Sequence, residues 1–209
     1  MFKILRHISL LTAIIAAVLL TAPAFAAEPA AVDAARKLYT EVNSLISAKK
    51  TKMMEVTLPW YSAPNGMNQT TKMRFWFTEE TKLGENDMPV TTAALHKAAV
   101  THQFADMKPM ETDEYYFNAK GGLVFYYSVA DVTEEAMNEH LESRYYYDKG
   151  SLVRVIEETR PINDKTAKPV RDQRDKGFSE DMAASSKFFL KRQAELRAVF
   201  YGVYNARGF

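Results

Sequence analysis

The sequence contains no cysteine. Disulfide bonds and thiolate metal sites are therefore excluded, and no lipid can be attached to an N-terminal cysteine. A chain without these cross-links must be stabilised by packing alone. This is feasible here, because a domain of about 180 residues buries roughly 70% of the surface that its unfolded chain exposes.

An excess of charge of either sign is also missing. The chain has 27 basic and 26 acidic residues and a formal net charge of +1. Because nucleic-acid-binding domains normally carry a basic excess, we expect no nucleic-acid partner. The content of 47% hydrophobic and 25% charged residues is typical of a globular protein, and the length predicts a single domain.

The common catalytic motifs are absent as well. No serine lies in a G-x-S-x-G context, and the sequence contains no H-E-x-x-H, no G-x-x-x-x-G-K-[ST] and no G-x-G-x-x-G. Outside the N-terminal segment the histidines are His96, His102 and His140, and none has a second histidine at a metal-ligand spacing. We therefore expect no metal site and no cofactor.

The N-terminal segment carries the strongest signal in the chain. Lys3, Arg6 and His7 give a positive start, residues 8–20 form an uncharged apolar run, and residues 24–26 have the small-x-small pattern that signal peptidase accepts. This order is typical of a secretory signal peptide. An uncleaved membrane anchor is the alternative, but a membrane-spanning helix needs ~20 apolar residues and this run is shorter.

We therefore predict a signal peptide at residues 1–26 and a single exported domain at residues 27–209. The avoidance of cysteine and the alanine-rich flank favour the periplasm of a Gram-negative bacterium, with full secretion as the alternative. No stable membrane span is expected after cleavage, because no later segment is apolar enough to cross a bilayer.

Two segments have the apolar periodicity of amphipathic helices. In residues 29–48 the apolar side chains recur at spacings of three and four, which places them on one face. A second and longer helix is predicted after Ser179, a good N-cap residue. Its apolar residues recur every seven positions: Met182, Phe189, Leu196 and Val203.

The region between these helices contains alternating apolar and polar residues, which indicate strands. Residues 52–58 predict a first strand that is followed by a loop at residues 59–70, and Met73, Phe75 and Phe77 predict a second strand. Two ranges are less regular. Residues 79–92 are predicted to be a loop, and within residues 93–106 a strand at 98–106 is preferred to a helix.

The chain has one internal repeat. Residues 114–127 and residues 144–156 each consist of an aromatic strand, a glycine-containing turn and a β-branched strand, the signature of a β-hairpin. Joined by residues 130–141, the two hairpins predict a four-stranded antiparallel meander within a sheet of six or seven strands. The polar residues at about 159–178 are expected to form an exposed linker.

The two hairpins resemble those of small exported bacterial proteins of unknown function, which carry paired hairpins of the form Tyr-Tyr-aromatic, turn glycine and Leu-hydrophobic. The resemblance rests on Tyr115-Tyr116-Phe117 with Leu123, and on the run of tyrosines at 145–147 with Leu152. It implies a sheet flanked by helices and no established activity. No functional residue can be carried over from it.

The predicted fold is an α+β domain, in which an antiparallel β meander packs against an N-terminal helix and a long C-terminal helix. Successive side chains of a strand point to opposite sheet faces. We expect the helices to cover one face and the other to present Tyr116, Tyr126 and Tyr146, or the complementary set, as a platform for a ligand. A purely structural role is the alternative, because aromatic residues favour sheets. Trp60 and Tyr61 are a second candidate contact, unless they form a lid packed on the core.

The aromatic strands and the missing motifs together favour a non-catalytic binding or interaction module. Its expected partner is a protein, a peptide, or a small apolar or glycan ligand. Two alternatives remain open. One is a periplasmic hydrolase whose site combines dispersed residues such as His140 with neighbouring glutamates. The other is a structural component of the envelope that self-associates through the apolar stripe of the C-terminal helix.

Overall fold

The computed structural model describes residues 29–61, 68–104, 111–134, 137–162, 169–174 and 177–207. The predicted signal peptide lies outside this part of the chain. The secondary structure elements, in chain order, are α2 (Ala30–Ser47), β1 (Lys52–Tyr61), β2 (Asn68–Leu83), the 3-10 turn η1 (Glu85–Asp87), β3 (Pro89–Phe104), β4 (Glu111–Phe117), β5 (Leu123–Glu134), β6 (Met137–Asp148), β7 (Ser151–Pro161), β8 (Pro169–Arg174) and α3 (Glu180–Ala206).

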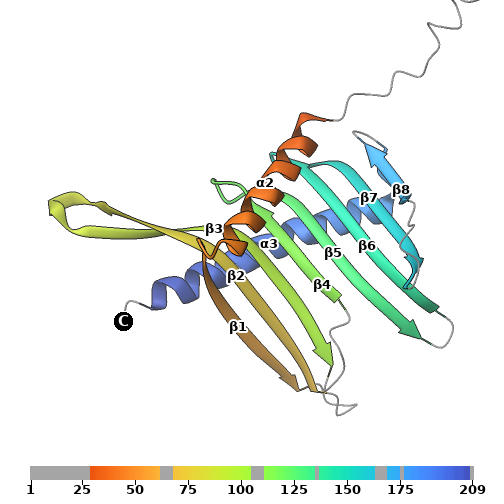
Figure 1. Ribbon diagram of the computed structural model, residues 1–209, viewed down its shortest axis with the longest axis horizontal. Coiled ribbons are helices and arrows are strands. Elements are labelled where there is room, and N and C mark those ends of the chain that lie inside the picture. The colour runs from red at the N-terminus through yellow and green to blue at the C-terminus, as the bar shows by residue number, and fades with distance from the viewer. Residues whose placement is uncertain are drawn as a thin grey trace, which may run out of the picture.

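Among the described residues, eight strands form one antiparallel sheet in which every strand pairs with its neighbours in sequence. The order β1 to β8 is therefore an uninterrupted meander (Figure 1). The sheet is larger than the six or seven strands expected. The predicted class is confirmed: an α+β fold with an antiparallel meander, an N-terminal helix and a long C-terminal helix.

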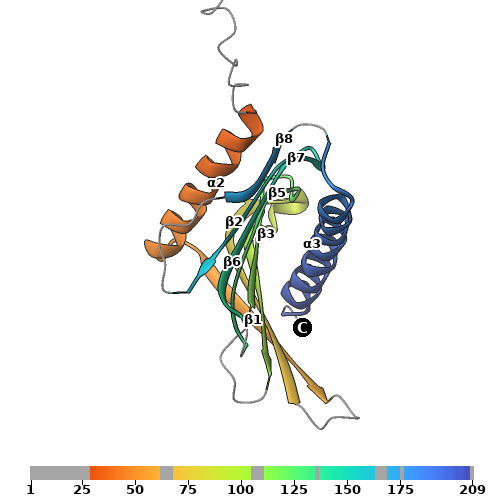
Figure 2. The same cartoon turned by 90° about the vertical axis from the view of Figure 1, so that its right-hand side faces the viewer.

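The two helices lie on opposite faces of the sheet (Figure 2). Each face has its own apolar core, because the side chains of every strand alternate between the two sides. The core beneath α3 is the larger and includes Phe75, Phe77 and Phe117. The core beneath α2 combines Val32, Ala35 and Val42 of the helix with aromatic side chains of the central strands.

Helix α3 buries a stripe that begins as predicted and then shifts. Met182 and Leu196 are buried, and Phe189 packs against the core. Val203 is 39% exposed, whereas Phe200 is fully buried against Phe75 and Phe77. The shift has a geometric reason: an α-helix rotates by about 20° per heptad away from a strict seven-residue repeat.

The two predicted hairpins are confirmed, and they are alike in detail. In the β4–β5 hairpin the register shifts between Tyr116 and Phe117, and in the β6–β7 hairpin it shifts between Tyr146 and Tyr147. The turn residues Gly121 and Gly150 have φ angles of 76° and 83°, a region that suits glycine because it has no Cβ. The sequence repeat therefore corresponds to a structural repeat.

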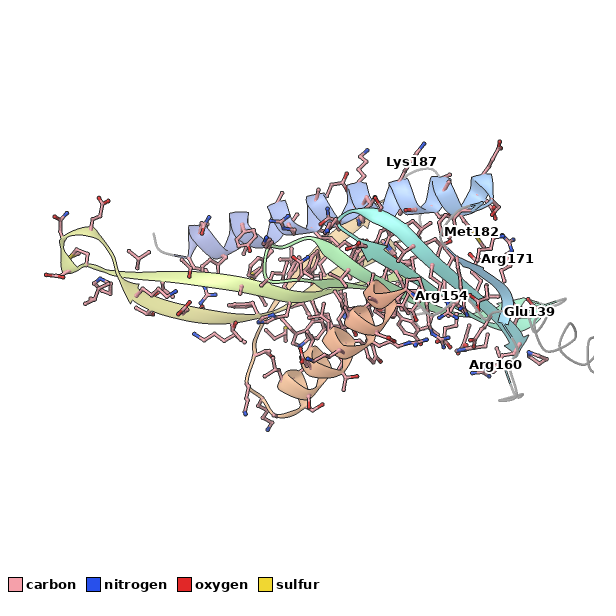
Figure 3. The ribbon with its side chains drawn as sticks, turned by 90° about the horizontal axis from the view of Figure 1, so that it is seen from above. Glu139, Arg154, Arg160, Arg171, Met182 and Lys187 are labelled. Atoms are coloured by element: carbon pink, nitrogen blue, oxygen red, sulfur yellow. The ribbon has the colours of Figure 1, made fainter. Side chains whose placement is uncertain are left out.

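The region expected to be a loop at residues 79–92 is a two-stranded extension of β2 and β3. The two strands remain paired from Phe77 with Leu95 as far as Leu83 with Pro89. Because β1 begins opposite Phe77 and β4 reaches no further along β3 than Lys97, this arm projects beyond the rest of the sheet (Figure 3). Both faces of the arm are largely exposed, so its sequence has no apolar alternation to indicate strands.

The expected linker at about 159–178 also contains regular structure, since β7 extends to Pro161 and β8 occupies Pro169–Arg174. The charged residues there hold β8 in place. The Nε and Nη2 atoms of the buried Arg154 donate to the two carboxylate oxygens of Asp172 at 2.9 and 2.8 Å. Arg171 contacts Asp181 in the first turn of α3.

Helix α3 begins where it was predicted to begin, but the capping hydrogen bond expected there is not formed. Ser179 occupies the N-cap, yet its side chain makes no capping hydrogen bond. Within the described ranges, neither helix combines the length and the apolar character needed to cross a bilayer.

Candidate functional site

The three candidate tyrosines of the hairpins do not share a face. Tyr116 lies opposite Phe125 in the β4–β5 register, and Tyr126 lies opposite Tyr115 and Tyr145. Residues that are opposite in an antiparallel pair point to the same side. Tyr116 and Tyr146 therefore belong to the face under α2, and Tyr126 belongs to the face under α3.

The prediction that these tyrosines form a solvent-facing row is wrong, because a helix covers each face of the sheet where they lie. Tyr116, Tyr126 and Tyr146 have exposed fractions of 0%, 2% and 4%. The ring of Phe189 from α3 stacks on Tyr126 with 3.7 Å between centroids. The hydroxyl of Tyr126 donates to Asp113 Oδ1 at 2.6 Å.

Trp60 and Tyr61 are placed only in part. They form the end of β1, where they pair with Gln69 and Asn68 of β2. The expected loop at residues 59–70 is thus shorter than predicted, and the remaining residues of that range lie outside the described part of the chain. The side chains of Trp60 and Tyr61 also lie outside it.

The three histidines have separate partners. His96 Nε2 lies 2.9 Å from Thr78 Oγ1, and His102 Nδ1 lies 3.0 Å from Thr71 Oγ1. Burial lowers the pKa of the half-buried His96. Each imidazole thus has a hydroxyl partner on a neighbouring strand. His140 differs, because its Nδ1 lies 2.7 Å from a carboxylate oxygen of Asp131.

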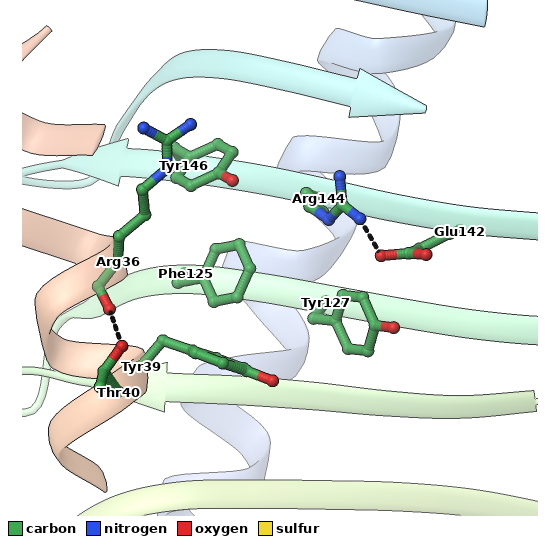
Figure 4. A pocket seen from close by; sticks show the side chains of 8 residues that line it. All are labelled: Arg36, Tyr39, Thr40, Phe125, Tyr127, Glu142, Arg144 and Tyr146. Atoms are coloured by element: carbon green, nitrogen blue, oxygen red, sulfur yellow. Dashed lines mark hydrogen bonds and ion pairs between the residues drawn. The ribbon is translucent and has the colours of Figure 1, made fainter. Parts of the chain in front are cut away.

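A pocket of about 300 Å³ opens beside α2, where the helix stops covering its face of the sheet (Figure 4). We call it the aromatic pocket. It is formed by one turn of α2 and by two neighbouring strands, β5 and β6. The lining residues are Arg36, Tyr39, Thr40, Phe125, Tyr127, Glu142, Arg144 and Tyr146.

Aromatic rings form the floor and one wall of the pocket. The ring planes of Tyr127 and Tyr146 lie at 24° and 36° to that of Phe125, so these three rings form a nearly continuous layer over the strands. Tyr39 stands at 89° to Phe125 and forms the wall on the helix side (Figure 4). Tyr39 is 39% exposed, so the wall can be reached from solvent.

The opposite end of the pocket is polar. Arg144 Nη2 contacts Glu142 Oε1, and Arg144 Nη1 donates to Glu158 Oε1 on β7 at 2.8 Å. These side chains are only partly exposed, with side-chain fractions of 28% for Arg144 and 16% for Glu142. Burial and the negative charge of Glu142 together raise the pKa of Tyr127 to about 12, so its hydroxyl is protonated at neutral pH.

The polar network continues along the same face of β5 and β6. His140 Nε2 lies 3.9 Å from Glu142 Oε2, and its other ring nitrogen contacts Asp131. A chain of contacts therefore runs from Asp131 through His140 and Glu142 to Arg144. Within the described residues, this chain of contacts is the part of the expected hydrolase site that lies next to the pocket.

Sequence reasoning identified Tyr146 but missed the other residues of the pocket. The sequence did contain a signal. Glu142, Arg144 and Tyr146 are spaced two apart, so on a strand they share one face and place two charged side chains beside an aromatic ring. The contribution of Arg36 and Tyr39 depends on where α2 crosses the sheet. That position cannot be obtained from the spacing of residues.

Two further hollows lie on the other flank of α2, with volumes of about 550 and 610 Å³. Both border the β4–β5 turn, where Asn118, Ala119 and Lys120 line each of them. They lack the combination of stacked rings with a paired acid and base that distinguishes the aromatic pocket.

The apolar stripe of α3 is occupied within the fold. Phe189 stacks on Tyr126, and Leu196 is 1% exposed. Self-association through these two side chains would therefore require α3 to leave the sheet.

Among the residues that the structure describes, no group of three or more histidine, aspartate or glutamate side chains is arranged to hold a metal ion. Comparisons with protein-family models, with curated proteins and with solved structures find no match to this chain, so the site is interpreted from its own geometry.

Proposed function

We propose that this protein is an exported, non-catalytic binding module that takes a small ligand into the aromatic pocket. The observation that carries the proposal is the meeting of an aromatic floor with the Arg144–Glu142 pair in one concave site. Ligand sites are typically apolar clefts with a few polar groups that orient the ligand. The location we propose is the periplasm or the extracellular space, in keeping with the signal-peptide pattern at residues 1–26.

The fold supports a binding role because the pocket is built on rigid parts. Its floor and its polar end come from the centres of paired strands, and its wall comes from a helix that is packed on the same sheet. A site formed before its ligand arrives loses little conformational entropy on binding.

Ligand-observed NMR with a library of neutral and charged fragments tests this proposal. We expect fragments that bind the native protein to lose at least tenfold in affinity in Tyr39→Ala and in Arg144→Met. Phe188→Ala is the matched control, because Phe188 is 59% exposed on α3, on the other face. Binding that is equal in all four proteins, or no binding at all, would contradict the proposal.

A hydrolase is the second candidate, and the contact between Asp131 and His140 favours it. An acidic residue on one ring nitrogen orients an imidazole for proton transfer by the other. Here that other nitrogen faces Glu142. The test is hydrolysis of ester, glycoside and peptide substrates by the native protein and by His140→Ala. Turnover that disappears in this variant would establish the hydrolase, and turnover that persists in it would come from another source.

A further inference from the structure

We propose that the ligand of the aromatic pocket is an uncharged saccharide of one or two rings. This inference rests on the proposed binding function and narrows it to one class of ligand. Three properties of the pocket lead to it: the balance of its charges, the one-sided aromatic floor, and the mixture of donors and acceptors at the polar end.

The charges of the pocket are balanced by groups of the protein itself. Arg144 contacts both Glu142 and Glu158, and Arg36 Nη1 lies 3.6 Å from Asp33 Oδ1. An anionic ligand would approach the carboxylate of Glu142, and a cationic ligand would approach the guanidinium groups of Arg36 and Arg144. Because like charges at close range cost free energy, the pocket favours a ligand without net charge.

The aromatic surface lies on one side of the pocket only. The accessible aromatic surface comes from the partly exposed Tyr127 over the strands and from Tyr39 of α2, because Phe125 and Tyr146 beneath them are only 5% and 4% exposed. Tyr39 stands at 89° to Phe125 (Figure 4). Ring faces carry negative partial charge and attract the positive edge of a C–H bond. A saccharide ring presents several axial C–H bonds on one face, which suits a single floor. A planar base is bound best between two parallel rings.

The polar end of the pocket excludes a purely apolar ligand. Such a ligand would remove water from Glu142 and Arg144 without replacing its hydrogen bonds, and an unsatisfied polar group lowers the affinity. A saccharide hydroxyl both donates and accepts. Neighbouring hydroxyls can therefore donate to the Glu142 carboxylate and accept from Arg144, whose guanidinium has five N–H donors.

The volume sets the size of the ligand. About 300 Å³ is at the lower end of the range of roughly 300–1,000 Å³ found for small-molecule sites. One or two sugar rings fit such a space, and a longer chain would have to leave it over the exposed edge of Tyr39.

The experiment uses saturation-transfer NMR and calorimetry with a defined panel: glucose, galactose, N-acetylglucosamine, maltose, cellobiose and di-N-acetylchitobiose. At least one member should bind, with saturation strongest at the C–H groups of one ring face. Its affinity should fall at least tenfold in Tyr127→Ala and in Glu142→Gln. The controls Phe188→Ala and Glu195→Gln, both on α3, should leave it unchanged.

Tyr39→Ala is a further variant, at a partly exposed side chain, and it should also weaken saccharide binding. The saccharide class is wrong if no panel member binds, or if binding is the same in the pocket variants. If indole, adenine or a charged fragment binds instead, and its binding depends on Tyr39 and Arg144, the saccharide class is wrong but the proposed binding function is supported. If neither the panel nor those fragments bind, both proposals fail.

Discussion

The ammonium nitrogen of Lys97 lies 2.6 Å from a carboxylate oxygen of Glu114 beneath α2, and the Lys97 side chain is only 8% exposed. The other carboxylate oxygen accepts a hydrogen bond of 2.7 Å from Tyr116, whose hydroxyl in turn receives one from Asn43 of α2 at 3.1 Å. Lys97 also faces the rings of Trp76 and Tyr116. This network attaches the second half of α2 to the sheet.

We expect Lys97→Met to lower the free energy of unfolding by about 3 kcal/mol, because it leaves the partly buried carboxylate of Glu114 without its cation. The double variant Lys97→Met/Glu114→Gln should be more stable than Lys97→Met alone. Urea unfolding followed by fluorescence measures both. Arg74→Met is the control, since the Arg74–Glu55 pair is exposed and should contribute less than about 1 kcal/mol. Additive effects of the two substitutions would contradict the coupling.

The rotation of the apolar stripe on α3 leads to a second prediction. Phe200→Ala should cost about 3–5 kcal/mol, because it removes a fully buried ring. Val203→Ala should change the free energy of unfolding by less than about 1 kcal/mol, although Val203 is the residue that continues the seven-residue repeat. Thermal unfolding of both variants is the measurement. Similar losses for the two would show that α3 follows the heptad to its end.

Asp172 predicts a dependence of stability on pH. The hydrogen bond from Arg154 is the main cause that lowers the pKa of Asp172 from 3.8 to about 2. A carboxyl group with a depressed pKa stabilises the fold above its ordinary pKa and loses this effect as the pH falls through the depressed value. Asp172→Asn should thus be less stable than the native protein by about 1.5–3 kcal/mol at pH 7.

The difference between Asp172→Asn and the native protein should shrink between pH 4 and pH 2 and vanish below pH 2. Urea unfolding at several pH values measures it. A difference that is constant from pH 7 to pH 2 would mean that the carboxylate charge has no role in holding β8.

Three glycines should respond differently to replacement by alanine. Gly150→Ala should cost about 1 kcal/mol, because its φ of 83° is unfavourable for alanine although the added Cβ would meet no neighbour. Gly121→Ala should cost more, since its Cβ would also lie 2.7 Å from Arg197. Gly202→Ala should raise stability by up to about 1 kcal/mol, because Gly202 lies inside α3 with open space around it. Chemical unfolding ranks the three, and any other order would refute the assignment of their roles.

The parts of the fold that could be predicted from the sequence are those in which a local pattern and the tertiary structure agree. The hairpins at 114–127 and 144–156 combine turn glycines with strands that are buried on both faces. The two helices have one apolar face each. The β2–β3 arm and β8 were missed because their side chains are mostly exposed or charged, so burial left no alternating pattern in the sequence.

For the candidate site, the sequence predicted only that aromatic side chains would take part. Aromatic side chains in β4, β5 and β6 were recognised, but their distribution between two covered faces depends on the register of the sheet. The pocket exists because α2 places Arg36, Tyr39 and Thr40 beside Tyr127 and Arg144 of the sheet. That relation links residues far apart in the chain, and no short motif encodes it.

The uninterrupted order of the strands also bears on how the chain reaches its fold. Each strand needs only the preceding one as a template, and most connections between strands are short, so little loop-closure entropy is lost at any single step. A sheet of this kind can assemble hairpin by hairpin from the N-terminal side as the chain is synthesised. Helix α3 follows the eight described strands in the chain, so it seals one face only after they are present.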